Sequence, residues 1–254
     1  MNAALIAQNT FREATRDRML SGVMIAGLVI LIATQVMSPL ALGEGLRLTI
    51  DLGLSAISML GLLVVLLVGS SLVAKEIDRR TIFNLLSRPI TRPAYLLGKW
   101  AGLAGALWVV VAGLGLALWL VLLSRGSGDH AVSIFQATYL AGLELSVVTA
   151  CAVLFSSLST PVLSALYTLG LYLVGQWSYD LRSFAGHVPA PLSTVLGTAA
   201  NLAPNLPLFN MRTLAAAGEL TTPWHLGVAT AYAAVYVGSV LCLASAAFES
   251  RDFK

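Results

Sequence analysis

Six long apolar runs divide the chain, and they constrain its fold more than any other feature. A helix needs roughly 20 apolar residues to cross the hydrocarbon of a bilayer. Because backbone groups in lipid must pair internally, each run is expected to cross as a helix. The sequence therefore predicts an all-α membrane protein with six transmembrane helices. The expected spans are residues 19–42, 49–74, 95–123, 132–158, 161–177 and 225–248.

The composition agrees with a single membrane domain over residues 1–254. Hydrophobic residues make up 57% of the chain and charged residues 11%, whereas a soluble domain averages about 25% charged residues. Cys151 and Cys242 both lie inside apolar runs, so they predict neither a disulfide framework nor a metal cluster. Residues 1–18 lack the apolar core and cleavage site of a signal peptide, so we expect the first run to remain as an anchor.

The basic residues indicate how the spans are oriented. With six spans both termini lie on one side, and eleven of the fifteen basic residues fall in that side's segments. Cytoplasmic loops carry such an excess of Lys and Arg, so both termini are expected to be cytoplasmic. This distribution also accounts for the basic character of the chain without nucleic acid, for which no aromatic and basic interleaving is visible. The lipid bilayer is the expected surrounding.

Two segments outside the spans are predicted to contain helices. Thr10 followed by Glu13 matches a capping box, which starts a helix, and Glu13 precedes Arg16 at a favourable helical spacing. We therefore expect an interfacial helix within residues 1–18 on the cytoplasmic face. Residues 178–224 are rich in proline and are expected to form an outer loop with short helices that can dip back into the membrane.

The most charged stretch, residues 75–92, lies between the second and third spans. Glu76 precedes Arg79 and Arg80 at helical spacing, while Arg88 stands before a proline, which disfavours continuing the helix. Pro93 suits the first turn of a new helix, with Thr91 before it as a cap. The stretch thus predicts a short amphipathic cytoplasmic helix, whose apolar side is formed by Ile77, Ile82, Phe83, Leu85 and Leu86. On these grounds alone, docking to a soluble partner and contact with lipid headgroups are equally supported.

The stretch resembles a motif of a known family. The pattern T-x-x-x-L-L-S-R-P-I-T-R-x-x-Y-L-L-G-K after an acidic start is similar to the coupling helix of the membrane subunit of type-2 ATP-binding-cassette (ABC) exporters. "TFREATRDR", "LFSSLSTPVLSAL", "LAPNLPLFNMR" and "FESRDFK" are similar to other segments of that family, in the same order along the six spans. The resemblance therefore covers the whole chain.

The resemblance implies a permease that pairs with a second permease chain, expected to be a copy of itself, and docks two copies of an ABC ATPase. It also implies the bacterial inner membrane. Residues 75–90 would then insert into the ATPase. Their charged side chains would make polar contacts, and their apolar side chains would fill a groove of the ATPase. The implied docking residues are Glu76, Asp78, Arg79, Arg80, Thr81, Ile82, Phe83, Leu86 and Arg88.

The chain itself carries no phosphate-binding motif. Gly98 and Lys99 are followed by Trp100, where the P-loop pattern requires Ser or Thr. We therefore expect no enzyme activity and no cofactor in this chain, with ATP and Mg²⁺ held by the partner ATPase. The three histidines are scattered on outer segments without the ligand spacing of a metal site.

Glu144 lies near the middle of the fourth span, where a carboxylate is costly. It is either a proton or substrate contact or, as we favour, a structural hydrogen-bonding group. The polar residues offered by the first three spans are Thr34, Gln35, Ser55 and Ser58. No other convergent polar set is visible inside the spans, which argues against an intramembrane enzyme.

Gly98, Gly102 and Gly105 form one side of the third span. Small residues at this spacing favour close helix packing, here within one chain or between two.

Three functions therefore remain open on the sequence. The leading hypothesis is the permease subunit of an ATP-driven ABC exporter. One alternative is a scaffold or assembly factor that recruits a cytoplasmic protein without transporting anything. The other alternative is a proton-coupled carrier that uses Glu144. The almost wholly apolar spans suit a hydrophobic or amphiphilic cargo, or a tightly closed pathway.

Overall fold

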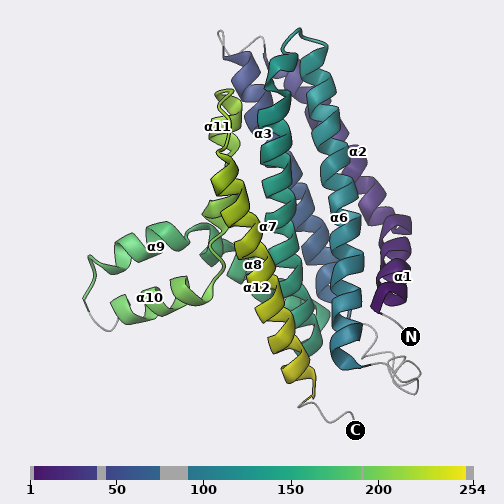
Figure 1. Ribbon diagram of the computed structural model, residues 1–254, viewed down its shortest axis with the longest axis vertical. Coiled ribbons are helices and arrows are strands. Elements are labelled where there is room, and N and C mark those ends of the chain that lie inside the picture. Colours follow the sequence, from purple (N-terminus) through teal and green to yellow (C-terminus); the bar gives the residue numbers. More distant parts are fainter. Residues whose placement is uncertain (1–2, 39–43, 75–90, 190–191, 250–254) are drawn as a thin grey trace.

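The computed structural model describes residues 3–38, 44–74, 91–189 and 192–249, and this part of the chain is helical without strands (Figure 1). Five of its helical segments are long and apolar enough to cross a membrane. They contain α2 (Arg18–Met37), α3 (Gly45–Leu67), α6 (Arg92–Leu123), α7 (Ala131–Leu158) and α12 (Pro223–Glu249). The all-helical class and five of the predicted spans are thereby confirmed.

The fifth predicted span, residues 161–177, matches one helix to within one residue, but this helix is short for a membrane crossing. It is α8 (Pro161–Gln176), which has only 16 residues. At 1.5 Å per residue it extends about 24 Å, less than the roughly 30 Å of hydrocarbon. Two short helices, α9 (Ser178–Ala185) and α10 (Leu192–Leu202), follow it and project sideways from the bundle (Figure 1).

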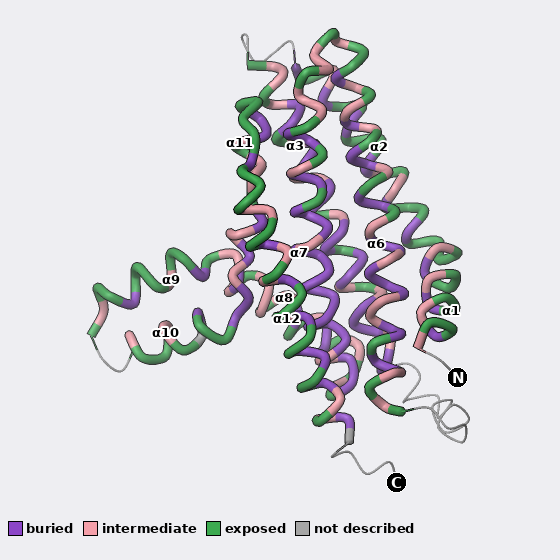
Figure 2. The backbone as a smooth tube through the Cα atoms, viewed as in Figure 1, coloured by how far each residue is buried: buried purple, intermediate pink, exposed green. Residues whose placement is uncertain are grey.

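The bundle is built around α7. This helix is buried over most of its length, on all sides, whereas α2 and α12 leave much of their surface exposed (Figure 2). α3, α6, α8 and α12 pack against it. Its contact faces carry many small residues, and at Gly142 the ring of Trp108 occupies the space that a Cβ would need. Close approach of several helices to one central helix follows from these small residues.

The N-terminal helix α1 (Ala3–Arg16) packs along the first half of α6. Its buried side carries Ile6, Thr10 and Ala14, four residues apart, while Arg12 and Arg16 are exposed. The spacing is that of an amphipathic helix with one packed face. The predicted capping box is wrong, because α1 begins at Ala3 and Thr10 lies in its middle, buried against α6 rather than capping.

At one end of the bundle, hydrogen bonds join the end of the α3 segment to α7 and the start of α6 to the end of α12. After α3 the chain tightens into the 3₁₀ turn η2 (Gly69–Ser71), and the N–H groups of Val73 and Ala74 donate to Ser156 Oγ of α7 at 3.0 and 3.1 Å. Arg92 donates to the carbonyl of Phe248 at 2.5 Å and lies over its ring. One end of the bundle thus ties α3 to α7 and α6 to α12.

The start of α6 follows the sequence prediction in part. Pro93 lies in its first turn, as expected, and Thr91 occupies the N-cap position with an extended backbone. The side chain of Thr91 makes no capping hydrogen bond, however. Thr91 therefore lies at the predicted cap position, but its side chain does not cap the helix.

Two short elements, η4 (Leu206–Phe209) and α11 (Arg212–Ala216), lie between α10 and α12. A third, η3 (Gly128–His130), lies between α6 and α7. The backbone N–H of Asn205 donates to the hydroxyl of Tyr232 at 2.8 Å, and the N–H of Thr221 donates to Gln136 at 2.8 Å. These bonds attach the segment after α10 to α12 and α7.

Gly102→Ala should destabilise the protein. A Cβ at this position would lie 2.6 Å from the carbonyl oxygen of Ala7, a backbone atom that cannot move aside cheaply. Overpacking of this kind costs about 1–3 kcal/mol, more than the roughly 0.5–1 kcal/mol gained by replacing a helical glycine. Thermal unfolding in detergent measures the effect. Gly170→Ala in α8 is the matched control, since nothing lies within 4 Å of its Cβ; equal melting temperatures for the two variants would contradict the prediction.

Candidate functional site

A buried polar cluster lies at the middle of the bundle. Glu144, midway along α7, is 2% exposed. Gln176, the last residue of α8, donates its amide to Glu144 Oε1 at 2.5 Å and to the hydroxyl of Tyr172 at 3.1 Å. Tyr172 and Gln176 are one helical turn apart, so they present their polar ends to the same place. The carboxylate, the amide and the phenol thus form one network between α7 and α8.

Arg212 brings a positive charge to this network. It is the first residue of α11, and its guanidinium interacts electrostatically with Glu144 and Tyr172. It also donates to Ser55 Oγ of α3 at 3.1 Å. A buried polar group is tolerated when it is hydrogen-bonded, and here Gln176 supplies the bond while the charge of Arg212 lies near enough to favour the carboxylate.

The cluster corrects two expectations. Glu144 is hydrogen-bonded, but its donor is Gln176 rather than any of the residues that the first three spans offered. A convergent polar set does exist inside the bundle, contrary to the expectation from the sequence. The sequence did not reveal this set, because Gln176 is the last residue of an apolar run and Arg212 follows Glu144 by 68 positions, outside the predicted spans. Two polar residues four apart in α8 were the available signal.

Gln35 belongs to a separate cluster near the turn between α6 and α7. Arg125 donates to Gln35 Oε1 at 2.5 Å and to Ser38 Oγ at 2.6 Å. A further bond of 3.5 Å reaches Thr49 of α3. This arginine therefore holds the ends of α2 and α3 to the turn after α6, and the structure does not bring Gln35 and Glu144 together.

The three glycines of α6 face α1. Cβ atoms at Gly98 and Gly102 would lie within 3 Å of α1 atoms, and one at Gly105 would touch the ring of Phe11 at 3.4 Å. The structure thus uses this glycine stripe within one chain. The docking residues lie outside the described residues, so their role stays a prediction. They are Glu76, Asp78, Arg79, Arg80, Thr81, Ile82, Phe83, Leu86 and Arg88.

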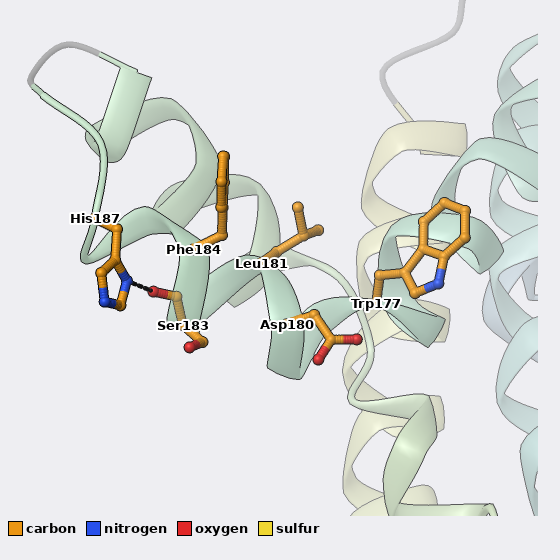
Figure 3. Close-up of a pocket in the computed structure, with 6 residues that line it drawn as sticks. All are labelled: Trp177, Asp180, Leu181, Ser183, Phe184 and His187. Atoms are coloured by element: carbon orange, nitrogen blue, oxygen red, sulfur yellow. Dashed lines mark hydrogen bonds between the residues drawn. The ribbon is translucent and has the colours of Figure 1, made fainter.

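A hollow of about 460 Å³ opens on the exposed side of α9. It is lined by Trp177, Asp180, Leu181, Ser183, Phe184 and His187 (Figure 3). The Nδ1 atom of His187 lies 2.8 Å from the carbonyl oxygen of Ser183. In the close-up the Asp180, Ser183 and His187 side chains point to one side of the helix and Leu181 and Phe184 to the other.

Within the described part of the chain, no group of three or more His, Cys, Asp or Glu side chains is placed to hold a metal ion. The network around Glu144 contains one carboxylate, and its other members are an amide, a phenol and an arginine. These groups can hold α7 and α8 together by hydrogen bonds, and the arginine adds a positive charge near the carboxylate.

The long apolar helices around a central helix define a multi-pass membrane protein. A family model described as "ABC-2 family transporter protein" matches residues 4–243. The chain therefore belongs to the ABC-2 transporter family, and its class is that of a transmembrane permease. A comparison with curated protein sequences gives no match.

Gln176→Leu should destabilise the bundle, because Glu144 would lose its amide donor while remaining buried. Leaving a buried polar group without its partner costs about 1–3 kcal/mol, and more for a charge. The double variant Glu144→Leu with Gln176→Leu should lose less than the sum of the two single changes, as expected for groups in contact. Thermal unfolding in detergent measures all three. Gln8→Leu, at an exposed position of α1, should change little, and additive losses at 144 and 176 would refute the coupling.

Proposed function

We propose that the chain is the permease subunit of an ATP-driven ABC exporter in a bacterial inner membrane. Two copies form the pathway, and each docks one copy of a separate ATPase through residues 75–90. The observation that carries the proposal is the family match over residues 4–243, joined to the sequence motif at 75–92. ABC-2 permeases work with an ATP-binding subunit, which supports a partner ATPase here.

The distribution of charge supports the orientation. The bundle end that holds α1, the start of α6 and the end of α12 carries Arg12, Arg16, Arg92 and Lys99. Cytoplasmic segments are enriched in such residues. We therefore assign this end to the cytoplasm, which places both termini inside and the turn around Arg125 outside.

The path of the chain supports six crossings. α8 begins at Pro161, next to the cytoplasmic end of α7, and α12 begins at the opposite end of the bundle. The chain must therefore cross between them, and it does so as a discontinuous element: α8, then the α9–α10 pair, then η4 and α11. Transporters often build such broken helices near the middle of the membrane, where they line cavities.

The anchoring of the cytoplasmic end supports coupling to a partner. Residues 75–90 connect Ala74, held by Ser156 of α7, to Arg92, held by the end of α12. A displacement of that segment by a docked ATPase would act on both helix pairs at once. Packed helices have discrete arrangements, so such a displacement can switch a bundle between inward- and outward-facing states.

Replacing Arg80 and Phe83 together by alanine should abolish association with the ATPase encoded beside this chain. Buried aromatic and arginine side chains dominate interfaces, each costing about 2 kcal/mol or more when truncated, and each 1.4 kcal/mol is about tenfold in affinity. Co-purification in mild detergent measures the loss. Arg12→Ala with Arg16→Ala removes charge from the same side without touching 75–90; normal co-purification of the Arg80 and Phe83 variant would count against the docking role.

Vesicle transport separates the exporter from its rivals. An exporter requires ATP and keeps at least part of its activity in Glu144→Gln, because that change preserves the hydrogen-bonding shape of the cluster. A proton-coupled carrier, which the buried Glu144 carboxylate alone would favour, should follow the pH gradient and lose activity in Glu144→Gln. A scaffold should bind its partner and move nothing. Uptake into inverted vesicles, with and without ATP, is the measurement.

A further inference from the structure

One side of α9 carries a polar stripe that is exposed. Asp180, Ser183 and His187 are spaced by three and four residues, so they lie along one side of the helix and the turn that ends it. All three are exposed, and the carboxylate of Asp180 has no hydrogen bond or ion pair with any described residue. Beside the stripe, Trp177 and Phe184 line the same hollow and are 59% and 56% exposed (Figure 3).

The level of α9 makes this exposure unusual. The bond between Gln176 and Glu144 fixes the end of α8 halfway along α7, and α9 begins two residues later. Figure 1 shows α9 and α10 leaving the bundle sideways at that level. With the chain in a membrane, as the proposed function requires, the stripe lies at the depth of the hydrocarbon.

This side of α9 is too polar to face lipid hydrocarbon. An ionised carboxylate facing hydrocarbon is costly, and intramembrane acidic side chains face protein or water instead. Irregular backbone, such as the turn at Gly186 and His187, is likewise tolerated at this depth only where protein or a cavity covers it. α10 covers only the opposite side, where Arg182 donates to the carbonyl of Ala200 at 3.1 Å.

The stripe is complementary to itself. Its acidic residue, Asp180, lies at one end and its imidazole, His187, at the other, with the small Ser183 between them. A two-fold axis beside Ser183 would cross two α9 helices in antiparallel fashion. Asp180 of each copy would then meet the partner's His187, because a two-fold contact joins the same surface on both copies.

We propose that the exposed side of α9 binds the same side of α9 in a second copy of this chain, antiparallel, with Asp180 against the partner's His187. The inference rests on the proposed function, because it takes the chain to be membrane-embedded and paired. To the pairing of two copies it adds that α9 forms the contact and that Asp180 lies against the partner's His187.

Cysteine cross-linking tests the register. Two differently tagged copies carry Cys242→Ser, which removes the exposed native cysteine; Cys151 is buried and stays. One copy carries Asp180→Cys and the other His187→Cys, and membranes containing both are mildly oxidised. We expect a disulfide-linked dimer containing both tags. Copies that carry only Asp180→Cys should not link, because antiparallel pairing separates them by about 10 Å along the helix, beyond the roughly 7 Å that a disulfide spans.

Arg182→Cys with His187→Cys is the matched control, because Arg182 faces α10 of its own chain. Pull-down through one tag reports pairing independently of the disulfide. Paired copies without a 180-to-187 link, or with a 180-to-180 link, overturn this proposal and leave the proposed function intact. Copies that do not pair at all overturn both.

Charge exchange gives a second measurement that does not depend on cysteine. His187→Glu places two carboxylates together and should lower the share of untagged copy recovered with the tagged one. Adding Asp180→Lys to the same chain restores opposite charges and should restore recovery. Equal recovery from the single and double variants would overturn the register.

Discussion

The hydrogen bond from Gln176 to Glu144 holds the end of α8 beside the middle of α7, and the path of the chain from α8 to α12 depends on that position. If α8 continued as a straight span, α9 and α10 would lie in the aqueous phase beyond the bundle. Because it ends at the middle of α7, the chain must turn within the apolar layer and return through η4 and α11 to the start of α12. Arg212 of α11 places its charge near the same network and donates to Ser55 of α3, so the returning segment is attached to the bundle there.

The opposite end depends on close packing rather than on charge. Gly98 and Gly102 let α1 lie directly on α6, where any side chain would collide with α1 backbone or Cβ atoms. The basic side of α1 stays outward as a result. The N-terminal helix is therefore part of the bundle itself, attached to the helix that comes after residues 75–90.

Features that depend on local periodicity could be predicted from the sequence, whereas features that depend on distant contacts could not. Apolar run length indicated the spans, and Pro93 marked the start of α6, because both act within one segment. The capping box at Thr10 failed because the packing of α1 on glycines of a later helix overrides a local signal. The end of α8 could be predicted to within one residue, but its level beside the middle of α7 and the hydrogen-bond donor to Glu144 could not, since both require knowing that Gln176 and Glu144 meet in space.

Ser156 holds the amides of Val73 and Ala74, which a continuous α3 would have bonded to its own carbonyls. Their protection from hydrogen exchange is therefore governed by the contact between α3 and α7, not by fraying of one helix. The two amides form a native reporter on that contact. Any event that pulls residues 73–74 away from α7 should appear first as faster deuterium uptake there, while the buried turns of α7 remain protected.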